Sequence, residues 1–434
     1  MEAYWGTIIL FGSLILGLIS GLPIAFTLAA IGIIFTYFLW GPQGFFMIAS
    51  TAFDKGTDFI LVALPLFILM GNFLEVSGIA DSLYEMMHRW FGRIAGGLAV
   101  GTIIICAIFA AMAGISGAAT VSMGLVAIPS MLRRKYDKQL ILGTIASGGA
   151  LGILIPPSII AIIYCSVTGL SVSKVYTACF GPGILLSVLY IIYILVRCSI
   201  QPHIGPPVEE KFTLREKLAS TRYVIGPLII ILVVLGTMYL GVCTPTESAA
   251  MGAFGTAVIC AIHGKLTWKN VKVAALRTFS ISGMCMWIVF GAFCFCKAYS
   301  VSGAGEFVTS LVVGLGIAPM GYIWIMMILL IFLGCFMETA AITLITVPIF
   351  LPIISALGFD PVWFGVLFII NAEMGLLSPP FGMTLFWLKA VVPPEITMTD
   401  IYRSIWPFII VQFICLVMVM YLPAIAMWLP SLVK

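Results

Sequence analysis

The sequence predicts an all-α polytopic membrane protein built from two inverted-topology repeats, each with about five spanning segments and one re-entrant helical hairpin. Three observations predict this: composition, an internal repeat and the distribution of basic residues. The 434 residues are 62% hydrophobic and 9% charged, with a mean hydropathy of +1.20, a balance typical of membrane helices. Apolar runs such as 103–113 and 322–333 lack the alternation of a membrane β-strand. The spanning segments are therefore expected to be helices.

Apolar segments lie on both sides of a hydrophilic linker at 197–222. They run at about 5–20, 23–40, 58–76, 94–132, 139–165 and 175–197, and then at about 223–242, 246–262, 280–298, 320–355, 361–390 and 404–429. Segments 94–132 and 320–355 approach twice the ~20 residues that one span needs. Polar or small residues interrupt each of them halfway. Each is therefore expected to be a hairpin that enters and leaves the membrane on the same side.

The two halves also share their helix-breaking residues. The glycine and double proline at 152–157 recur 223 positions later at 375–380, and the same shift relates Thr120 to Thr343. Such recurrence at one spacing indicates an internal repeat. Each half contains five crossings, an odd number, so the second half is expected to be inverted relative to the first.

The basic residues support this topology. With the N-terminus outside, 17 of the 21 Lys and Arg residues fall on the inner side, as the positive-inside rule requires; the linker contributes Arg197, Lys211, Arg215, Lys217 and Arg222 to this set. The other four are Lys55, Lys174, Lys297 and Lys434. The net charge of +4 thus reflects membrane orientation and gives no indication of nucleic-acid binding.

Residue patterns argue against an enzyme. Most of the eleven cysteines stand alone in apolar runs, and the three histidines have no metal-ligand spacing. The sequence contains no metalloprotease helix motif and no phosphate-binding loop. A Gly-x-Ser-Gly run at 114–117 has no basic partner nearby in sequence. The first apolar run, which no basic residue precedes, does not resemble a cleaved signal peptide and is expected to remain. Energy must therefore come from an ion gradient or from another subunit.

The double prolines identify a candidate site. A proline inside a helix removes a backbone hydrogen bond and clashes with the preceding turn, so 156–157 and 379–380 are expected to open their helices. Open backbone within a bilayer is tolerated only against protein or a water-filled cavity, where transporters hold substrates and ions. The hairpin tips at 114–120 and 337–343 supply two further breaks. Carbonyl, hydroxyl and carboxylate oxygens suit a hard cation, and free helix amides suit an anion.

Two sets of candidate residues follow from these breaks. The expected cation ligands are Ser116, Gly117, Thr120, Gly152, Pro156, Met337, Glu338, Thr339, Thr343, Gly375 and Pro379. The expected anion-binding residues are Ala118, Ala119, Pro157, Ser158, Asn371, Ser378 and Pro380.

Structural roles compete with these assignments. Membrane Ser and Thr side chains often bond to their own helix, and small residues often only permit close packing. The prolines can act as simple kinks. Glu338 is also placed to cap the second arm of its hairpin, Glu373 to serve in helix packing, and Glu247 to cap the span that begins at 244.

Four motifs carry a family resemblance. They are Gly-Ile-Leu-Ile-Pro-Pro-Ser at 152–158, Thr-Pro-Thr-Glu-Ser-Ala-Ala at 244–250, Phe-Met-Glu-Thr at 336–339 and Leu-Leu-Ser-Pro-Pro-Phe-Gly at 376–382. Together they resemble the large membrane subunit of TRAP transporters, the DctM type, over essentially the whole chain. That family often has Asp or Asn near the second tip and Thr before the second double proline. Here Glu338 and Ser378 stand there, and each keeps an oxygen ligand.

The resemblance implies a sodium-driven secondary importer of an organic acid anion, a carboxylate or sulfonate, in the cytoplasmic (inner) membrane of a bacterium or archaeon. It implies Na+ at the cation sites, an elevator motion, an extracytoplasmic binding protein and a small four-helix subunit on a separate chain. Two alternatives are a stand-alone divalent-anion/sodium symporter and a passive anion channel.

The same resemblance divides the chain into scaffold and transport regions. The expected divisions are a scaffold region and arm at 1–93, a first transport region at 94–165, the last helix of repeat 1 with the linker at 166–222, a second scaffold region at 223–319, a second transport region at 320–390 and a final helix at 391–434.

Overall fold

The computed structural model describes residues 3–208, 210, 212–314 and 316–432, and in these residues it contains α-helices and short 3-10 helices but no β-strand. Met1 and Glu2 of the expected first scaffold region, Lys211 of the linker and Lys434 lie outside the described residues. Six described helices are long and apolar enough to cross a membrane, and six shorter ones are apolar. The prediction of an all-helical polytopic membrane protein is confirmed at this level.

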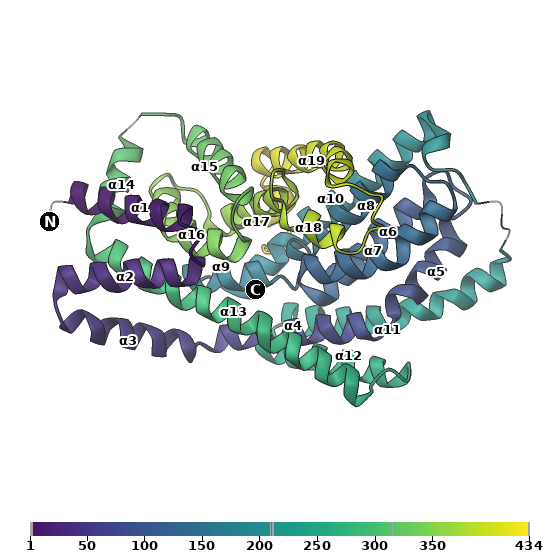
Figure 1. Cartoon of the computed structure of the whole chain (residues 1–434), viewed down its shortest axis with the longest axis horizontal. Helices are drawn as coiled ribbons and strands as arrows, with labels where there is room; N and C mark the ends of the chain where they lie inside the picture. The colour runs from purple at the N-terminus through teal and green to yellow at the C-terminus, as the bar shows by residue number, and fades with distance from the viewer. Residues whose placement is uncertain (1–2, 209, 211, 315, 433–434) are drawn as a thin grey trace.

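Four long helices form one packed group. They are α2 (Ile24–Trp40), α4 (Phe59–Val76), α12 (Pro245–Ile262) and α13 (Trp268–Val301). α13 packs along both α2 and α4, and α12 packs against α4 (Figure 1). Glycines allow the closest approach: a Cβ atom at Gly32 of α2 would lie 2.6 Å from the backbone nitrogen of Phe295 in α13. Small residues at helix crossings are how membrane helices gain contact area.

Several helices lie outside the apolar segments expected from the sequence. These are the short helices α3 (Gln43–Gly56), α5 (Ile79–Phe91) and α14 (Ala304–Val313), whereas α1 (Ala3–Ile19) and α11 (Leu214–Tyr239) overlap expected segments. α5 buries Leu83 and Met86 while exposing Asp81 and Glu85. A helix with polar residues on one side has no continuous apolar run, so a search for such runs overlooks it.

Each segment expected to be a hairpin contains two helices joined at an interruption. The first consists of α6 (Gly97–Ala113) and α7 (Ser116–Arg133), and the second of α15 (Pro319–Gly334) and α16 (Thr339–Ala356). Gly114 ends α6 with a φ of 65°, a left-handed conformation that glycine adopts without strain. The helices are interrupted at 114–115 and at 335–338, whereas 116–120 and 339–343 of the predicted tips are helical.

Both expected broken helices are present as well. The first is α8 (Lys138–Ala150), the 3-10 turn η1 (Leu151–Ile153) and α9 (Ile159–Thr168); the second is α17 (Pro361–Leu377) and α18 (Met383–Lys389). Residues 154–158 and 378–382 form the two openings, and each contains one cis peptide bond, Pro156–Pro157 or Pro379–Pro380. The double prolines open the helices as predicted.

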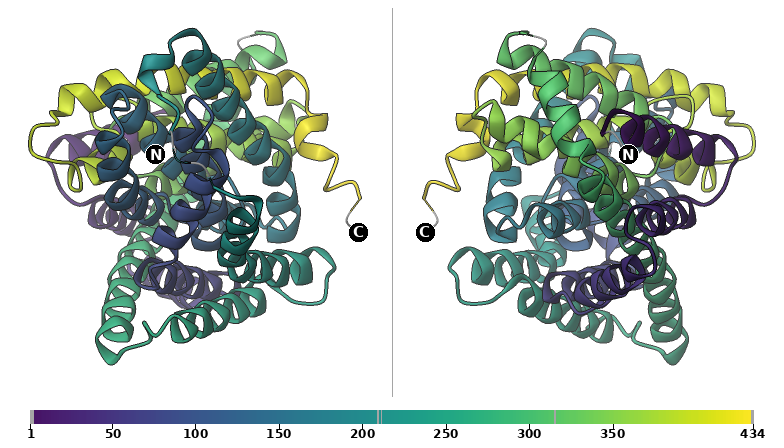
Figure 2. Two further views of the ribbon diagram at one scale, coloured as in Figure 1. Left: turned by 90° about the vertical axis from the view of Figure 1, so that its right-hand side faces the viewer. Right: turned by 90° about the vertical axis from the view of Figure 1, so that its left-hand side faces the viewer.

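Three further helices, α10 (Val172–Ile200), α19 (Met398–Tyr421) and α20 (Ala424–Met427), complete the described fold. α10, which precedes the 3-10 turn η2 (Pro202–Ile204), packs against α6, α17 and α19, and α20 follows at the C-terminal end. The sequence placed the last apolar segment at 404–429, but α19 begins earlier, at a capping box formed by Thr397 and Asp400. It ends at Tyr421, because Pro423 disfavours helical geometry in the residue before it. The end-on views show α11–α13 on one flank and α19 on the opposite one (Figure 2).

Local structure recurs between the two halves. Asp137 caps α8 and Asp360, 223 positions later, caps α17, each by accepting hydrogen bonds from the first turn of its helix. Gly78 and Gly303, 225 positions apart, both have a φ of 73° and each begins a short helix. Helix starts, tips and breaks thus follow one order in both halves.

Candidate functional site

The first hairpin tip lies directly against the first helix break. The backbone N–H of Ile159 donates to the carbonyl of Gly114 at 3.5 Å. A Cβ atom at Gly114 would lie 2.5 Å from the carbonyl oxygen of Pro157, and one at Gly152 would lie 2.9 Å from the carbonyl of Ile115. The chain at 114–116 and at 152–159 therefore packs backbone to backbone, which places helix ends next to each other in the interior.

The second arm of this hairpin starts without a side-chain cap. Ile115 precedes α7 in extended conformation and supplies no capping hydrogen bond. The first amides of a helix have no partner within the helix and carry its partial positive charge. Ser116 and Ala119 are buried there, and Gly117 and Ala118 are half-buried. This helix start has the features of an anion-binding place.

The hydroxyl of Thr120 turns back to its own helix. It donates to the carbonyl of Ser116 at 2.9 Å, and in the second hairpin Thr343 does the same to Thr339 at 2.8 Å. The structural role considered for these threonines is therefore observed in both halves. The hydroxyl oxygen keeps a free lone pair in this arrangement, so the bond is compatible with coordination.

The second tip differs in its cap. α15 ends at Gly334 and α16 begins at Thr339, and Glu338 accepts a hydrogen bond from the backbone of Ala340 at 3.1 Å. The capping role considered for Glu338 is thus present. Met337 and Glu338 are half-buried and Thr339 is buried. α16 therefore begins with a carboxylate cap, whereas α7 begins without a side-chain cap.

The second break packs against the second hairpin through two glycines. A Cβ atom on Gly375 would lie 2.7 Å from the Cα atom of Gly334. Asn371, which is buried one turn earlier, donates through Nδ2 to the carbonyl of Met327 in α15 at 2.9 Å, and its Oδ1 has no partner in the described structure. Asn371 therefore ties α17 to α15 and leaves one acceptor free.

Serine hydroxyls at the two breaks bond to backbone carbonyls. Ser378 donates to Met374 at 2.7 Å, and Ser158 donates to Ile153 and accepts from the N–H of Ala161 at 3.3 Å. Ser158 thereby caps α9. Both serines help to satisfy backbone that the prolines leave open.

Two tyrosines that the candidate sets did not include bind the breaks. Tyr176 of α10 donates to the carbonyl of Ser158 at 3.1 Å, and Tyr402 of α19 donates to the carbonyl of Pro380 at 2.5 Å. The two lie 226 positions apart, close to the spacing of the other repeated features. The spacing of these two tyrosines was the sequence signal that could have predicted their hydrogen bonds to the breaks.

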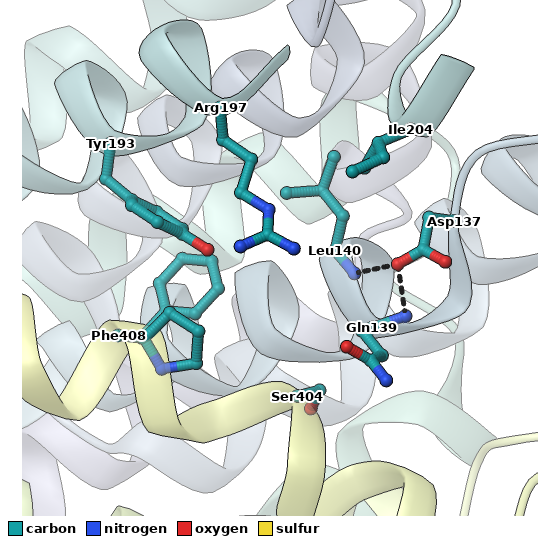
Figure 3. A pocket seen from close by; sticks show the side chains of 9 residues that line it. Asp137, Gln139, Leu140, Tyr193, Arg197, Ile204, Ser404 and Phe408 are labelled. Atoms are coloured by element: carbon teal, nitrogen blue, oxygen red, sulfur yellow. Dashed lines mark hydrogen bonds between the residues drawn. The ribbon is translucent and has the colours of Figure 1, made fainter. Parts of the chain in front are cut away.

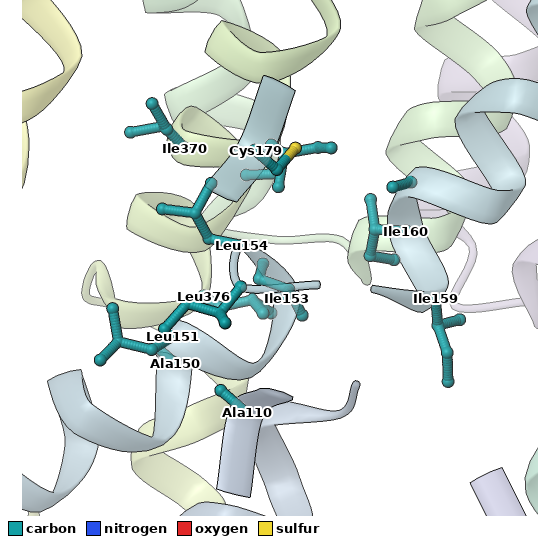
Figure 4. Packing of buried hydrophobic residues seen from close by; sticks show 14 of the residues in the cluster. Ala110, Ala150, Leu151, Ile153, Leu154, Ile159, Ile160, Cys179, Ile370 and Leu376 are labelled. Atoms are coloured by element: carbon teal, nitrogen blue, oxygen red, sulfur yellow. The ribbon is translucent and has the colours of Figure 1, made fainter. Parts of the chain in front are cut away.

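The two tip-and-break pairs also contact each other. A Cβ atom at Gly117 would lie 3.2 Å from the ring of Trp387 in α18, and α16 packs against α9. Figure 4 shows Leu151, Ile153 and Leu154 of the first break packed beside Ile370 and Leu376 of α17. The structure thus gathers all four interruptions into one region.

The two breaks differ in exposure. Gly152, Pro156 and Pro157 are buried, whereas Pro379 is half-buried and Pro380 is exposed. The candidate residues around the first break are therefore enclosed by protein, and the second break is open on one side.

Two glutamates of the sequence have clear positions. Glu247 forms a reciprocal capping box with Thr244 and accepts a hydrogen bond from the backbone N–H of Thr244 at 2.7 Å. The capping role considered for Glu247 is therefore observed. Glu373 is fully buried in α17, and neither of its carboxylate oxygens has a hydrogen-bond partner in the described structure.

A small cavity lies away from the breaks. It measures about 20 Å³ and is lined by Asp137, Gln139, Leu140, Tyr193, Arg197, Ile204, Ser404, Pro407 and Phe408 (Figure 3). This volume holds about one water molecule, which is too little for an organic acid. A second cavity of about 170 Å³, between α6 and α10, has a wholly apolar lining and offers an anion no polar partner.

The chain is similar to known transporters over most of its length. Residues 11–425 match the family model described as the DctM component of the tripartite ATP-independent periplasmic transporters. The C4-dicarboxylate TRAP transporter large permease protein DctM of Pseudomonas aeruginosa is 33% identical, covering 91% of this chain and 92% of that protein, and the one of Rhodobacter capsulatus is 32% identical, covering 98% and 99%. The isethionate TRAP transporter permease protein DctMQ of Oleidesulfovibrio alaskensis is 28% identical, covering 97% of this chain and 66% of that protein. The crystal structure of the Alcanivorax borkumensis YdaH transporter has a similar fold, with a TM-score of 0.67 at 13% identity over 98% of this chain and 99% of that one. By the family match and these relatives, the chain belongs to the DctM family of TRAP transporter large permeases.

Proposed function

We propose that this chain is the large membrane subunit of a sodium-coupled tripartite secondary transporter that imports an organic acid anion. The observation that carries the proposal is the convergence of four interrupted helices in one region. Interrupted helices expose carbonyl groups at one end and amide groups at the other, which gives one region acceptors for a cation and donors for an anion. No covalent step is involved.

Sodium would bind at the two tips, each against its neighbouring break. The first place is bounded by Ser116, Thr120 and Gly152, and the second by Glu338, Thr343 and Gly375. The close packing of Gly152 against Ile115 and of Gly375 against Gly334 supports both places. Pro156 and Pro379 would contribute by freeing carbonyls, and Gly117, Met337 and Thr339 through their backbone at the tips.

The substrate anion would lie between the two sodium places. The uncapped amides at the start of α7, at Ser116 to Ala119, supply donors for a carboxylate or sulfonate. Ser158, Asn371 and Ser378 supply polar side chains, and Pro157 and Pro380 shape the openings. C4-dicarboxylate and isethionate, named for two relatives, are a carboxylate and a sulfonate. Bound sodium would lower the cost of burying the anion, which couples the two.

The moving unit would contain 94–165 and 320–390 and would slide along the scaffold of α2, α4, α12 and α13. α10 and α19 pack on the two broken helices, and Tyr176 and Tyr402 bond to the breaks. We therefore assign these two helices to the moving unit, whereas the sequence-based division left them outside it. Inverted repeats, supported by the recurring caps and breaks, would give the unit two related conformations.

Two partners complete the proposal. An extracytoplasmic binding protein would deliver the anion, and a small four-helix subunit on a separate chain would brace the scaffold; the DctMQ name of one relative supports a small subunit. The N-terminus would lie outside the cytoplasmic membrane.

The proposal is tested by uptake into proteoliposomes. The chain is reconstituted with its small subunit and binding protein, and uptake of labelled succinate and isethionate is measured with an inward sodium gradient or with choline instead. Uptake that needs sodium and the binding protein is expected. Sodium-dependent uptake without the binding protein would favour the stand-alone symporter, and uptake without any ion gradient would favour the channel.

A further inference from the structure

A second group of polar side chains lies buried among α10, α17 and α19, apart from the hairpin tips. Glu373 of α17, Gln412 of α19 and Tyr190 of α10 each have a side-chain exposure of 0%. Both carboxylate oxygens of Glu373, Oε1 of Gln412 and the hydroxyl of Tyr190 have no hydrogen-bond partner in the described structure. Native proteins satisfy nearly all such atoms, so four orphans in one helix junction indicate a missing partner.

Contacts show that these side chains face the same junction. Gln412 donates through Nε2 to the carbonyl of Ile370, which lies one turn before Glu373 on α17, at 3.3 Å. Its amide oxygen is therefore left beside the face of α17 that carries Glu373. Tyr190 packs edge-on against Phe408 of α19, with ring centroids 5.6 Å apart. The three helices meet pairwise (Figure 1).

The surroundings of Glu373 contain no opposite charge in the stretches of the chain that the structure describes. Two titratable groups, Tyr190 of α10 and Cys415 of α19, lie within electrostatic range of its carboxylate. The charged side chains of the neighbouring helices stand at helix ends and form no ion pair with Glu373: Lys138 of α8, Lys174 and Arg197 of α10, Lys389 of α18, and Asp400 and Arg403 of α19. A buried carboxylate without a counter-charge is strongly unfavourable.

We propose that Glu373, Gln412 and Tyr190 form a binding site for one monovalent hard cation, with sodium as the fitting ion. The orphan atoms are all oxygens, which are the ligands that hard cations select. A single carboxylate neutralises one positive charge, so a divalent ion would leave a net charge in this dry junction. This site is separate from the two sodium places proposed at the hairpin tips.

The ion proposed at this junction would neutralise a buried charge within the moving unit. All three ligands come from helices that belong to the proposed moving unit, so the ion would stay enclosed while that unit slides. Cation binding would make the unit electrically neutral at this depth and would join the middle of α10 and of α19 to the last turns of α17.

The experiment measures binding of ²²Na+ to purified full-length protein by scintillation proximity, with choline chloride as the sodium-free reference. Glu373→Gln keeps the shape of the side chain and removes its charge, so it is expected to bind one sodium ion fewer per chain. Tyr190→Phe and Gln412→Leu each remove one neutral ligand and are expected to weaken sodium binding at this site several-fold. These two variants carry the test if Glu373→Gln does not fold.

The comparison with the tip sites separates this inference from the proposed function. In a Ser116→Ala/Glu338→Ala double variant, the ion held by Glu373 should remain bound. Loss of that ion only in the Glu373 variant, with no effect of the double variant, would support this site while contradicting the tips. Unchanged sodium binding in Glu373→Gln, Tyr190→Phe and Gln412→Leu would overturn the inference. So would an infrared band of a protonated Glu373 that persists at saturating sodium.

Discussion

At the scale of single residues, the candidate site depends on a few side chains that have two roles at once. Glu338 caps α16, and Thr120 and Thr343 bond to their own helices, yet each keeps lone pairs free. A cap explains why these residue types occur at a helix start. It does not fix where the remaining acceptors point, so substitution experiments must separate capping from ion binding.

A substitution at Glu338 separates capping from ion binding most directly. Glu338→Gln keeps a side-chain oxygen for the Ala340 amide but removes the negative charge, so the apparent sodium affinity of uptake should fall about tenfold, equivalent to about 1.4 kcal/mol. Uptake measured against sodium concentration checks this. Glu247→Gln is the matched control, because Glu247 also caps a helix start but lies away from the breaks. Equal sodium affinity in both variants would exclude Glu338 as a ligand.

Ser116 is expected to contribute less, because a hydroxyl is a neutral ligand. Ser116→Ala should lower the apparent sodium affinity by about two- to tenfold, in line with the net value of a neutral polar contact. Ser187→Ala serves as the control, since Ser187 is also a buried membrane serine that bonds to its own helix, at 2.8 Å from Gly183. A titration in which both variants match the unmodified protein would contradict the assignment.

The glycine pair at the second break makes a packing prediction. Gly375→Ala places a methyl group against Gly334, whose backbone cannot move aside as a side chain does, so it should destabilise the protein by about 1–3 kcal/mol. Thermal unfolding in detergent measures this. Gly283→Ala is the control, because nothing lies within 4 Å of a Cβ atom at that position of α13. Equal melting temperatures would show that the hairpin does not press on the broken helix.

At the scale of helices, an element could be predicted only where its own residues carry a local signal in the sequence. Double prolines remove backbone bonds wherever they stand, so the breaks near 156 and 379 were predictable from covalent chemistry alone. The tips also followed, because small and polar residues interrupt runs too long for one span. α3, α5 and α14 had no such signal, since amphipathic helices are defined by a partner surface that lies elsewhere in the chain.

The candidate site was predictable only in outline. Repeated spacing marked which positions correspond, but it did not show that Tyr176 and Tyr402 reach the break carbonyls. Those contacts depend on how α10 and α19 cross the broken helices. The orphan carboxylate of Glu373 was equally hidden, because a lone glutamate in an apolar run does not disclose whether a partner faces it.

The linker between the halves gives a pH prediction at this scale. Val208 donates to the carbonyl of Gly92 at 2.7 Å, and Phe212 packs edge-on against the ring of His88. Burial lowers the pKa of His88 below 6.5, and the nearby Arg134 lowers this pKa further, whereas Glu210 and Glu85 raise it and Arg89 lowers it slightly. Burial and Arg134 therefore disfavour the protonated ring in the folded protein, although Glu210 of the linker favours it.

The lowered pKa of His88 determines how the stability of the folded protein changes with pH. A base with a lowered folded pKa contributes fully to stability above its unfolded value and loses that contribution as pH falls below about 6.5. Hydrogen exchange of the Val208 amide, corrected for intrinsic rates, should therefore show less protection at pH 5.5 than at pH 7.5. In His88→Gln the protection should not vary with pH. A pH effect that persists in this variant would assign it to another group.

At the scale of the whole molecule, the arrangement separates into two packed groups with different neighbours. α2, α4, α12 and α13 hold one another, and the hairpins, the broken helices, α10 and α19 surround the four interruptions. The groups meet where α4 contacts α6 and α9 and where α13 contacts α16. An elevator motion requires these contacts to slide, because the interruptions themselves are held together by backbone packing within one group.

A cross-link across this boundary tests the motion directly. Cys296 of α13 donates through its sulfur to the carbonyl of Leu344 in α16 at 3.6 Å, so a second cysteine at 344 would stand next to it. In a background that keeps only Cys296, Leu344→Cys treated with a short bifunctional thiol reagent should lose sodium-dependent uptake almost completely. Untreated protein should transport normally. The control carries Leu344→Cys together with Cys296→Ser, where the reagent finds one thiol and uptake should continue. Full uptake by the cross-linked protein would show that α13 and α16 do not move past each other, and the division into scaffold and moving unit would then be wrong.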